Sequence, residues 1–203
     1  MDQRSGYGRV MPVQNLQDYF RTSIDEVIAG QGVDIDPHAT HYVVNMMTLF
    51  SRSEHFYEDG DEASGLRPLA LMLADAADSP TPEHRNQTLK RIGDVALFVA
   101  GFFTEGLRDK AMDVDYYMHM GQNAYGSLSE EVRGTLHGKA FADIYLELAL
   151  KFRLLMDVLG EVRGSGGQDL VRTFEVWRKT GSQRAERLLR EQGVFPIGGK
   201  PVH

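Results

Sequence analysis

Apolar residues recur along the chain at intervals of three and four, the spacing that gathers them on one side of an α-helix. The alternation of apolar and polar residues that is typical of a half-buried strand is nearly missing. Caps, prolines and glycine-rich turns divide the pattern into about eight segments. We therefore predict an all-α fold, a single-domain irregular helical bundle of about seven or eight helices that ends in a C-terminal helical hairpin.

The first half of the chain predicts four helices. Residues 15–29 form the first, which ends at the glycines of residues 30–32. The second covers residues 36–53 and begins with an aspartate cap followed by proline. An acidic stretch over residues 54–65 is expected to be a solvated loop, and the third helix follows over residues 66–77.

The fourth helix has the clearest start in the sequence. Thr81, Pro82 and Glu83 supply a cap, a proline in the first turn and an acid at the positive end of the helix dipole. Residues 92–103 are apolar nearly all round, which predicts that other helices surround this one. Gly93 and Gly101 in the same segment suit close approach of a neighbour.

Two further helices are expected in the second half. The fifth follows Asp113 and places these residues on one face: Tyr117, Gly121, Ala124, Tyr125 and Leu128. Ser129, followed by two glutamates, is expected to cap a sixth helix that continues to Val162. Its apolar register is predicted to include Val132, Leu136, Ala140, Phe141, Ile144, Leu148, Phe152, Leu155 and Leu159.

The predicted domain organisation follows from these segments. In chain order it is a flexible tail over residues 1–13, a helical bundle over residues 14–163, a helical hairpin over residues 168–192 that packs on the bundle, and a second tail over residues 193–203. The two helices of the hairpin are expected over residues 169–179 and 182–192.

Composition narrows the class of protein. Of the 203 residues, 42% are hydrophobic and 25% are charged, as in folded globular proteins. The absence of cysteine excludes disulfides, thiolate metal sites and cysteine nucleophiles. The longest apolar run, residues 95–103, is too short to span a bilayer, and the N-terminal residues lack the apolar core of a signal peptide. We therefore expect a cytoplasmic protein without a membrane span.

Charge is distributed unevenly. Residues 163–203 carry eight Lys/Arg and four Asp/Glu, a net charge of +4. Because the whole chain has a net charge of −7, residues 1–162 have a net charge of −11. The overall negative charge disfavours nucleic acid, because phosphate binding needs a basic surface. The basic end instead suits an acidic protein partner, which includes a second copy of this chain.

Common catalytic signatures are missing from the sequence, namely GxGxxG, the Walker motif, HExxH, GxSxG and the EF-hand loop. Their absence favours a protein that is not an enzyme, although bundle enzymes assemble sites from scattered residues. No cofactor is predicted outright, and a metal or haem stays open.

The candidate metal ligands are four residues of ligand type, His41, Glu54, His55 and His119. No Glu-x-x-His pair of the kind used by di-iron bundles occurs. Surface and capping histidines are therefore the favoured interpretation.

The densest mixture of polar and aromatic groups lies in the fifth helix. A haem or apolar ligand would use Tyr116, Tyr117, His119 and Asn123, with Asp115 placed to orient the histidine. Aromatic and methionine side chains are also ordinary core residues, and we favour that interpretation.

Two carboxylates interrupt the apolar fourth helix and its continuation. An unpaired buried carboxylate is costly, so Asp94 and Glu105 should each be exposed, hydrogen-bonded or paired. Arg91, Arg108 and Lys110 are candidate partners. The two acids lie about 16 Å apart along a helix and cannot form one acid–base pair.

The hairpin supplies the candidate partner-binding residues Arg178, Arg184, Arg187 and Arg190. Its outline resembles a DNA-binding helix-turn-helix, but Glu186 and Glu191 dilute the charge. Our leading hypothesis is a non-catalytic protein–protein interaction or assembly factor that uses the hairpin, the tails or the acidic stretch. The alternatives are a bundle that binds a metal, haem or apolar small ligand, with possible redox activity, and a DNA-associated regulator that uses the hairpin.

Overall fold

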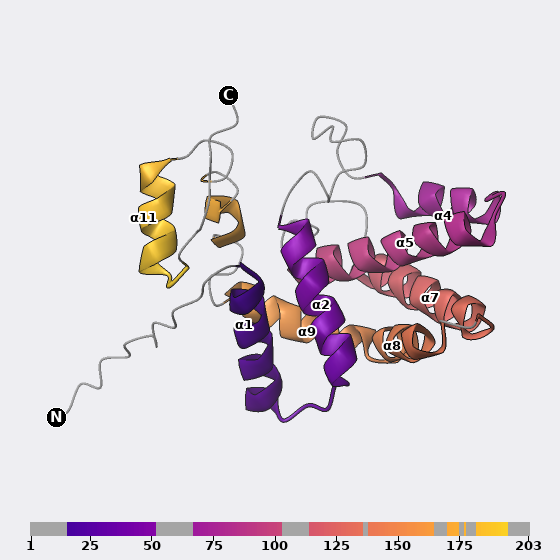
Figure 1. Cartoon of the computed structure of the whole chain (residues 1–203), viewed down its shortest axis with the longest axis horizontal. Helices are drawn as coiled ribbons and strands as arrows, with labels where there is room; N and C mark the ends of the chain where they lie inside the picture. The colour runs from indigo at the N-terminus through magenta and orange to yellow at the C-terminus, as the bar shows by residue number, and fades with distance from the viewer. Residues whose placement is uncertain are drawn as a thin grey trace.

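The computed structural model describes residues 16–51, 67–102, 114–135, 138–164, 170–174, 177 and 182–194. These residues form an all-α helical bundle, which confirms the predicted fold class. The helices, drawn in Figure 1, are α1 (Leu16–Gln31), α2 (Pro37–Phe50), α4 (Leu69–Ala77), α5 (Pro82–Phe102), α7 (Val114–Arg133), α8 (Lys139–Leu150), α9 (Phe152–Val162) and α11 (Gln183–Glu191).

Helix α5 is the centre of the bundle. Every residue from 92 to 102 is buried, as the apolar run predicts, and α4, α7 and α9 all pack against this helix. Figure 1 shows α4, α5, α7 and α8 following one another across the molecule, with α1 beside α2 and packed against α9. Gly93 and Gly121 allow the close packing, because a Cβ on them would lie 2.5 Å from the Tyr125 ring and 2.3 Å from the Phe152 ring respectively.

The connection from α1 to α2 follows the predicted caps. Helix α1 continues through Gly30 and stops at Gly32, whose φ of 62° suits glycine and ends a helix. Asp36 caps α2, since its Oδ1 accepts hydrogen bonds from the backbone N–H groups of His38 at 2.7 Å and Ala39 at 3.3 Å. The prediction that α2 begins at Asp36 and Pro37 is confirmed.

The prediction of one long helix from Ser129 to Val162 is wrong. Helix α7 passes through Ser129 and ends at Arg133, and α8 and α9 follow as separate helices joined at Lys151. Ser129 is buried, and its hydroxyl donates to the backbone oxygen of Ala142 in α8 at 2.7 Å. The cap-like residue therefore joins two neighbouring helices, a role that the cap signature does not distinguish from capping.

The C-terminal part of the described chain belongs to the same apolar core. Leu170, Trp177 and, on α11, Ala185 and Leu189 are buried within it. Ser182 caps α11 by accepting a hydrogen bond from the Ala185 N–H at 3.3 Å. Among the described helices, none combines the length and apolar character needed to cross a membrane. The two predicted tails, apart from residues 193 and 194, and the acidic stretch of residues 54–65 lie outside the described residues.

Candidate functional site

The most polar part of the interior is centred on Asp94 of α5, whose relative exposure is 4%. Its Oδ1 accepts hydrogen bonds from the Tyr42 hydroxyl at 2.5 Å and the Tyr125 hydroxyl at 2.7 Å. Its Oδ2 lies 2.6 Å from Lys90 Nζ, one helical turn earlier. The prediction that a buried Asp94 must be hydrogen-bonded or paired is confirmed, with Lys90 in place of Arg91 as its partner.

Three tyrosine rings surround this carboxylate. Tyr42 meets Tyr125 and Tyr145 edge to face, with ring centroids 6.3 Å and 5.8 Å away, and Tyr125 stacks on Tyr145. Burial, and after it the charge of Asp94, raises the pKa of Tyr42 and Tyr125 well above the usual value and the pKa of Tyr145 to about 12. The hydroxyl groups therefore stay protonated at neutral pH and remain donors.

The carboxylate of Asp94 is buried and mostly occupied. Two hydroxyl groups and one ammonium group take up three of its roughly four lone-pair positions, and Tyr125 has no exposed surface. A general base or a metal ligand needs a free lone pair that faces a substrate or ion. We therefore interpret this cluster as a structural connection between α2, α5 and α7. Glu105, Arg108 and Lys110 lie outside the described residues.

The candidate cofactor residues on α7 divide between two sides of the helix. Tyr117 lies on the buried face with Gly121 and Tyr125, as the spacing predicts. His119 and Asn123 are exposed on another side. Tyr116 accepts a hydrogen bond from the Ala70 N–H of α4 at 3.1 Å, so its hydroxyl fastens two helices. The four side chains therefore do not converge on one enclosed space.

The candidate metal ligand His41 lies on the exposed side of α2. Arg21 NH2 of α1 lies 3.3 Å from its Nδ1, and the Asn45 amide lies 3.0 Å from its Nε2. The guanidinium and the amide NH2 group can only donate, and a neutral imidazole accepts through one ring nitrogen, so His41 accepts one of these two contacts. Glu54 and His55 lie outside the described residues, and the described part of the chain brings no three His, Cys, Asp or Glu side chains together as a metal site.

A groove of about 420 Å³ lies beside His41, between α1 and α2. Its apolar wall includes Ile28, Val33, Ile35 and Val44, and Arg21, Asp25 and Thr40 supply polar groups. Its mixed lining suits a small amphipathic ligand, and sequence analysis did not find the groove because it needs two helices in their folded positions.

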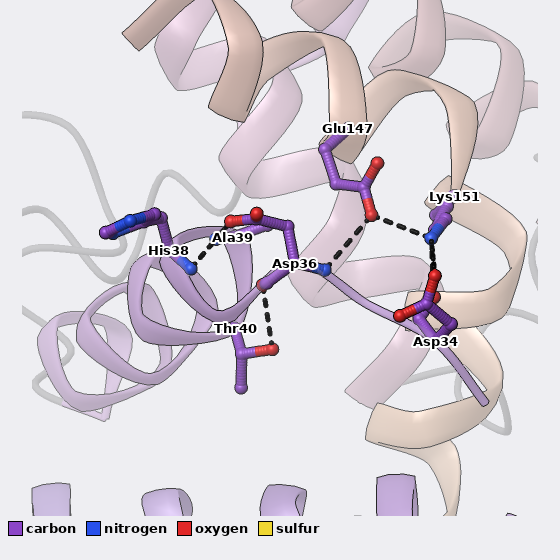
Figure 2. Close-up of polar contacts among 7 residues, drawn as sticks. All are labelled: Asp34, Asp36, His38, Ala39, Thr40, Glu147 and Lys151. Atoms are coloured by element: carbon purple, nitrogen blue, oxygen red, sulfur yellow. Dashed lines mark hydrogen bonds and ion pairs between the residues drawn. The ribbon is translucent and has the colours of Figure 1, made fainter. Parts of the chain in front are cut away.

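A second polar cluster fastens the turn before α2 to the junction of α8 and α9 (Figure 2). Glu147 Oε1 accepts a hydrogen bond from the Asp36 N–H at 3.1 Å and lies 2.9 Å from Lys151 Nζ. Lys151 Nζ also donates to the backbone oxygen of Asp34 at 2.5 Å. The hydrogen bond to Glu147 is the main cause that raises the pKa of Lys151. These contacts hold Lys151 at the point where α8 ends.

The candidate partner-binding residues of α11 lie on its outward side. Arg184, Arg187 and Arg190 are exposed, and Leu188 among them is 39% exposed. Arg190 pairs with Glu186 at 2.7 Å, whereas Arg184 and Arg187 form no ion pair with any residue that the structure describes. Arg178 lies outside the described residues.

Helix α8 exposes apolar side chains that the sequence did not single out. Leu146 and Leu150 are 38% and 72% exposed, and Phe141, predicted to be buried, is 55% exposed. The sequence did contain a signal that Leu146 and Leu150 are exposed, because both fall outside the apolar register predicted for this helix. Phe141 is a correction, since it lies on the exposed side of the first turn of α8, in which Ala142 is the buried residue.

No protein-family model, curated protein or solved structure matches the chain. Function is therefore inferred from the chemistry of the described surfaces.

Proposed function

We propose that the protein is a non-catalytic interaction module that binds an acidic protein partner through the outward side of α11. The observation that carries this proposal is the pair of exposed arginines, Arg184 and Arg187, which have no carboxylate partner in the described part of the chain. Arginine is enriched in protein interfaces because its planar guanidinium group binds carboxylates through two hydrogen bonds.

The geometry of α11 supports the proposal. Arg184, Arg187 and Leu188 occupy positions i, i+3 and i+4, which lie together on a helix surface. The opposite side is anchored in the core by Ala185 and Leu189. A partner would therefore meet two positive charges with an apolar side chain beside them, on a helix whose other side is packed in the core.

Charge also favours a protein partner over DNA. Glu186 lies on the same helix and neutralises Arg190 at 2.7 Å, so α11 does not present a uniformly basic surface to phosphates. The remainder of the chain is acidic, and its repulsion of a polyanion would reach beyond α11 at low salt. The basic surface of α11 is small and includes a leucine, which suits a small acidic patch with neighbouring apolar groups on a protein better than it suits a DNA duplex.

The test is affinity capture from the native host with the full chain as bait. We expect the Arg184→Glu/Arg187→Glu variant to lose a partner that the unaltered chain retains, and added salt to weaken the retained binding. The matched control is Arg67→Glu/Arg85→Glu, which makes the same change of net charge on another side. Equal capture by both variants, or capture of nucleic acid alone, would contradict the proposal.

A further inference from the structure

Six residues form an exposed line along α8 and α9, which we call the outer stripe: Lys139, Asp143, Leu146, Leu150, Arg153 and Asp157. All six are exposed, and successive members are separated alternately by four and three residues. The five intervals average 3.6 residues, the period of an α-helix, so the six side chains lie along one side of the α8–α9 segment. A helix that packed along this side would therefore face all six.

The two leucines at the middle of the outer stripe are the apolar part. Leu150 is 72% exposed, the largest exposure given for any large apolar side chain in the described part of the chain, and Leu146 is 38% exposed. They lie one turn apart on the same side of α8. Covering both would remove apolar surface from water, which favours association.

The charged members flank the leucines on both sides and are available to a partner. Lys139, Arg153 and Asp157 form no ion pair within the described residues. Asp143 has one long contact, 3.6 Å to Arg133, and both of these side chains are more than half exposed. The order along the stripe is thus basic, acidic, leucine, leucine, basic, acidic.

The junction at Lys151 does not interrupt the stripe. Although Lys151 leaves the helical conformation, with φ −102° and ψ 18°, its N–H still bonds to the Glu147 oxygen at 2.9 Å. The Leu155 N–H likewise bonds to the Lys151 oxygen at 2.9 Å. Burial agrees, since Leu148 and Leu155 face the core on the two sides of the junction while the six stripe residues stay exposed.

We infer that the outer stripe is the interface of a homodimer in which two copies of the chain pair their α8–α9 segments antiparallel. A two-fold axis midway between Leu146 and Leu150 places Leu146 against the partner's Leu150. The same axis places Asp143 against the partner's Arg153 and Lys139 against the partner's Asp157. Two-fold symmetry repeats each contact, so four leucines are flanked by four ion pairs.

Other pairings of the same stripe are unfavourable. In a parallel pair, Lys139 would face the partner's Lys139 and Asp143 the partner's Asp143, so like charges would repel. Sliding either helix by seven residues would place the leucines against charged groups and leave the ion pairs unmade. The outer stripe is therefore complementary to a second copy of itself only when the two run antiparallel with Leu146 opposite Leu150.

The size of the surface sets the expected strength. From Lys139 to Asp157 the stripe is about 27 Å long at 1.5 Å per residue. One helix pair of this length covers less area than the roughly 1,200 Å² at which stable interfaces begin, so the dimer is expected to form and dissociate with protein concentration. This surface is separate from the arginines of α11 and does not depend on the proposed partner.

The first test is sedimentation velocity of the full chain over a range of concentrations. The unaltered chain is expected to shift from monomer to dimer, and Leu146→Glu/Leu150→Glu to stay monomeric. The matched control Leu71→Glu/Leu73→Glu, which alters two exposed leucines of α4, should still dimerise. A chain that is monomeric at every concentration, or equally dimeric in both variants, overturns the inference.

Charge exchange tests the contacts. Asp143→Arg places two like charges opposite each other twice per dimer and should weaken association at least tenfold. Adding Arg153→Asp in the same chain restores opposite charges and should recover the dimer, which a merely misfolded variant would not do. Failure of this rescue would overturn the predicted pairing.

The absence of cysteine from the chain allows a direct test of orientation. Leu146→Cys and Leu150→Cys chains, mixed and oxidised, should form a disulfide-linked dimer faster than either chain alone. Fastest linkage of Leu150→Cys with itself would indicate a parallel pair and contradict the inference. The dimer and the α11 proposal are tested separately. The Arg184→Glu/Arg187→Glu variant is expected to dimerise normally, so loss of the dimer would not count against the α11 proposal.

Discussion

A carboxylate in the core and a leucine on the surface reverse the usual distribution of residue types in this protein. Asp94 is 4% exposed and Leu150 is 72% exposed. The aspartate is tolerated inside because Tyr42, Tyr125 and Lys90 supply three donors from the same chain. The leucine has no comparable cover in the described part of its own chain. Partners, more than residue type, decide where each side chain is stable.

Truncating each of the two residues to alanine is expected to have very different effects on stability. Asp94→Ala leaves the buried Tyr125 hydroxyl and the Tyr42 hydroxyl without their acceptor, and we expect a loss of about 3 kcal/mol in the free energy of unfolding. Leu150→Ala in monomeric protein should change it by less than about 0.5 kcal/mol. Urea unfolding measures both, and a larger loss for Leu150→Ala would contradict the interpretation.

Two glycines of α7 differ in the same way, because Gly121 is tightly packed and Gly126 has open space beside it. Gly121→Ala places a methyl group 2.3 Å from the Phe152 ring, and we expect overpacking to cost about 2 kcal/mol. Gly126→Ala on the same helix meets no atom within 4 Å and should instead stabilise by about 0.5–1 kcal/mol through helix propensity. Thermal unfolding measures both effects as shifts in melting temperature. Shifts of the same sign in the two variants would contradict the packing of Gly121 against Phe152.

Alkaline pH is expected to destabilise the tyrosine cluster around Asp94 without any mutation. The pKa of Tyr145 is about 12 in the folded protein and about 10 in the unfolded chain, so the unfolded chain loses its proton first. The contribution of Tyr145 to stability is therefore fully present below about pH 10 and is lost as the pH rises toward 12. Urea unfolding across this range measures the fall, which Tyr145→Phe should reduce.

Much of the interior was predictable because it depends on local spacing. The start of α2 follows from Asp36 and Pro37, and the need of Asp94 for partners follows from the cost of an unpaired buried charge. Lys90 lies one turn away and was accessible to the same reasoning. Tyr42 and Tyr125 were not, because they lie 52 and 31 residues away and only the packing of three helices brings them to Asp94.

The surface was less predictable for a related reason. Ser129 has the sequence of a cap, yet its hydroxyl bonds to Ala142 once α8 lies beside α7. The cap signature misplaced the boundary between α7 and α8, because local signals compete with tertiary contacts at helix boundaries. The outer stripe was missed although Leu146 and Leu150 fall outside the predicted apolar register, because the sequence does not show which side of α8 the neighbouring helices leave uncovered.

The contact between Asp36 and Glu147 joins residues 111 positions apart, which has a consequence for synthesis of the protein. At about 5–20 residues per second, a ribosome needs about 5–20 seconds to deliver Glu147 after Asp36. During that interval α1 has left the ribosome or lies near its exit, while α9, against which it packs, does not yet exist. The apolar side of α1 that packs against α9 is therefore left without this neighbour while the intervening residues are synthesised.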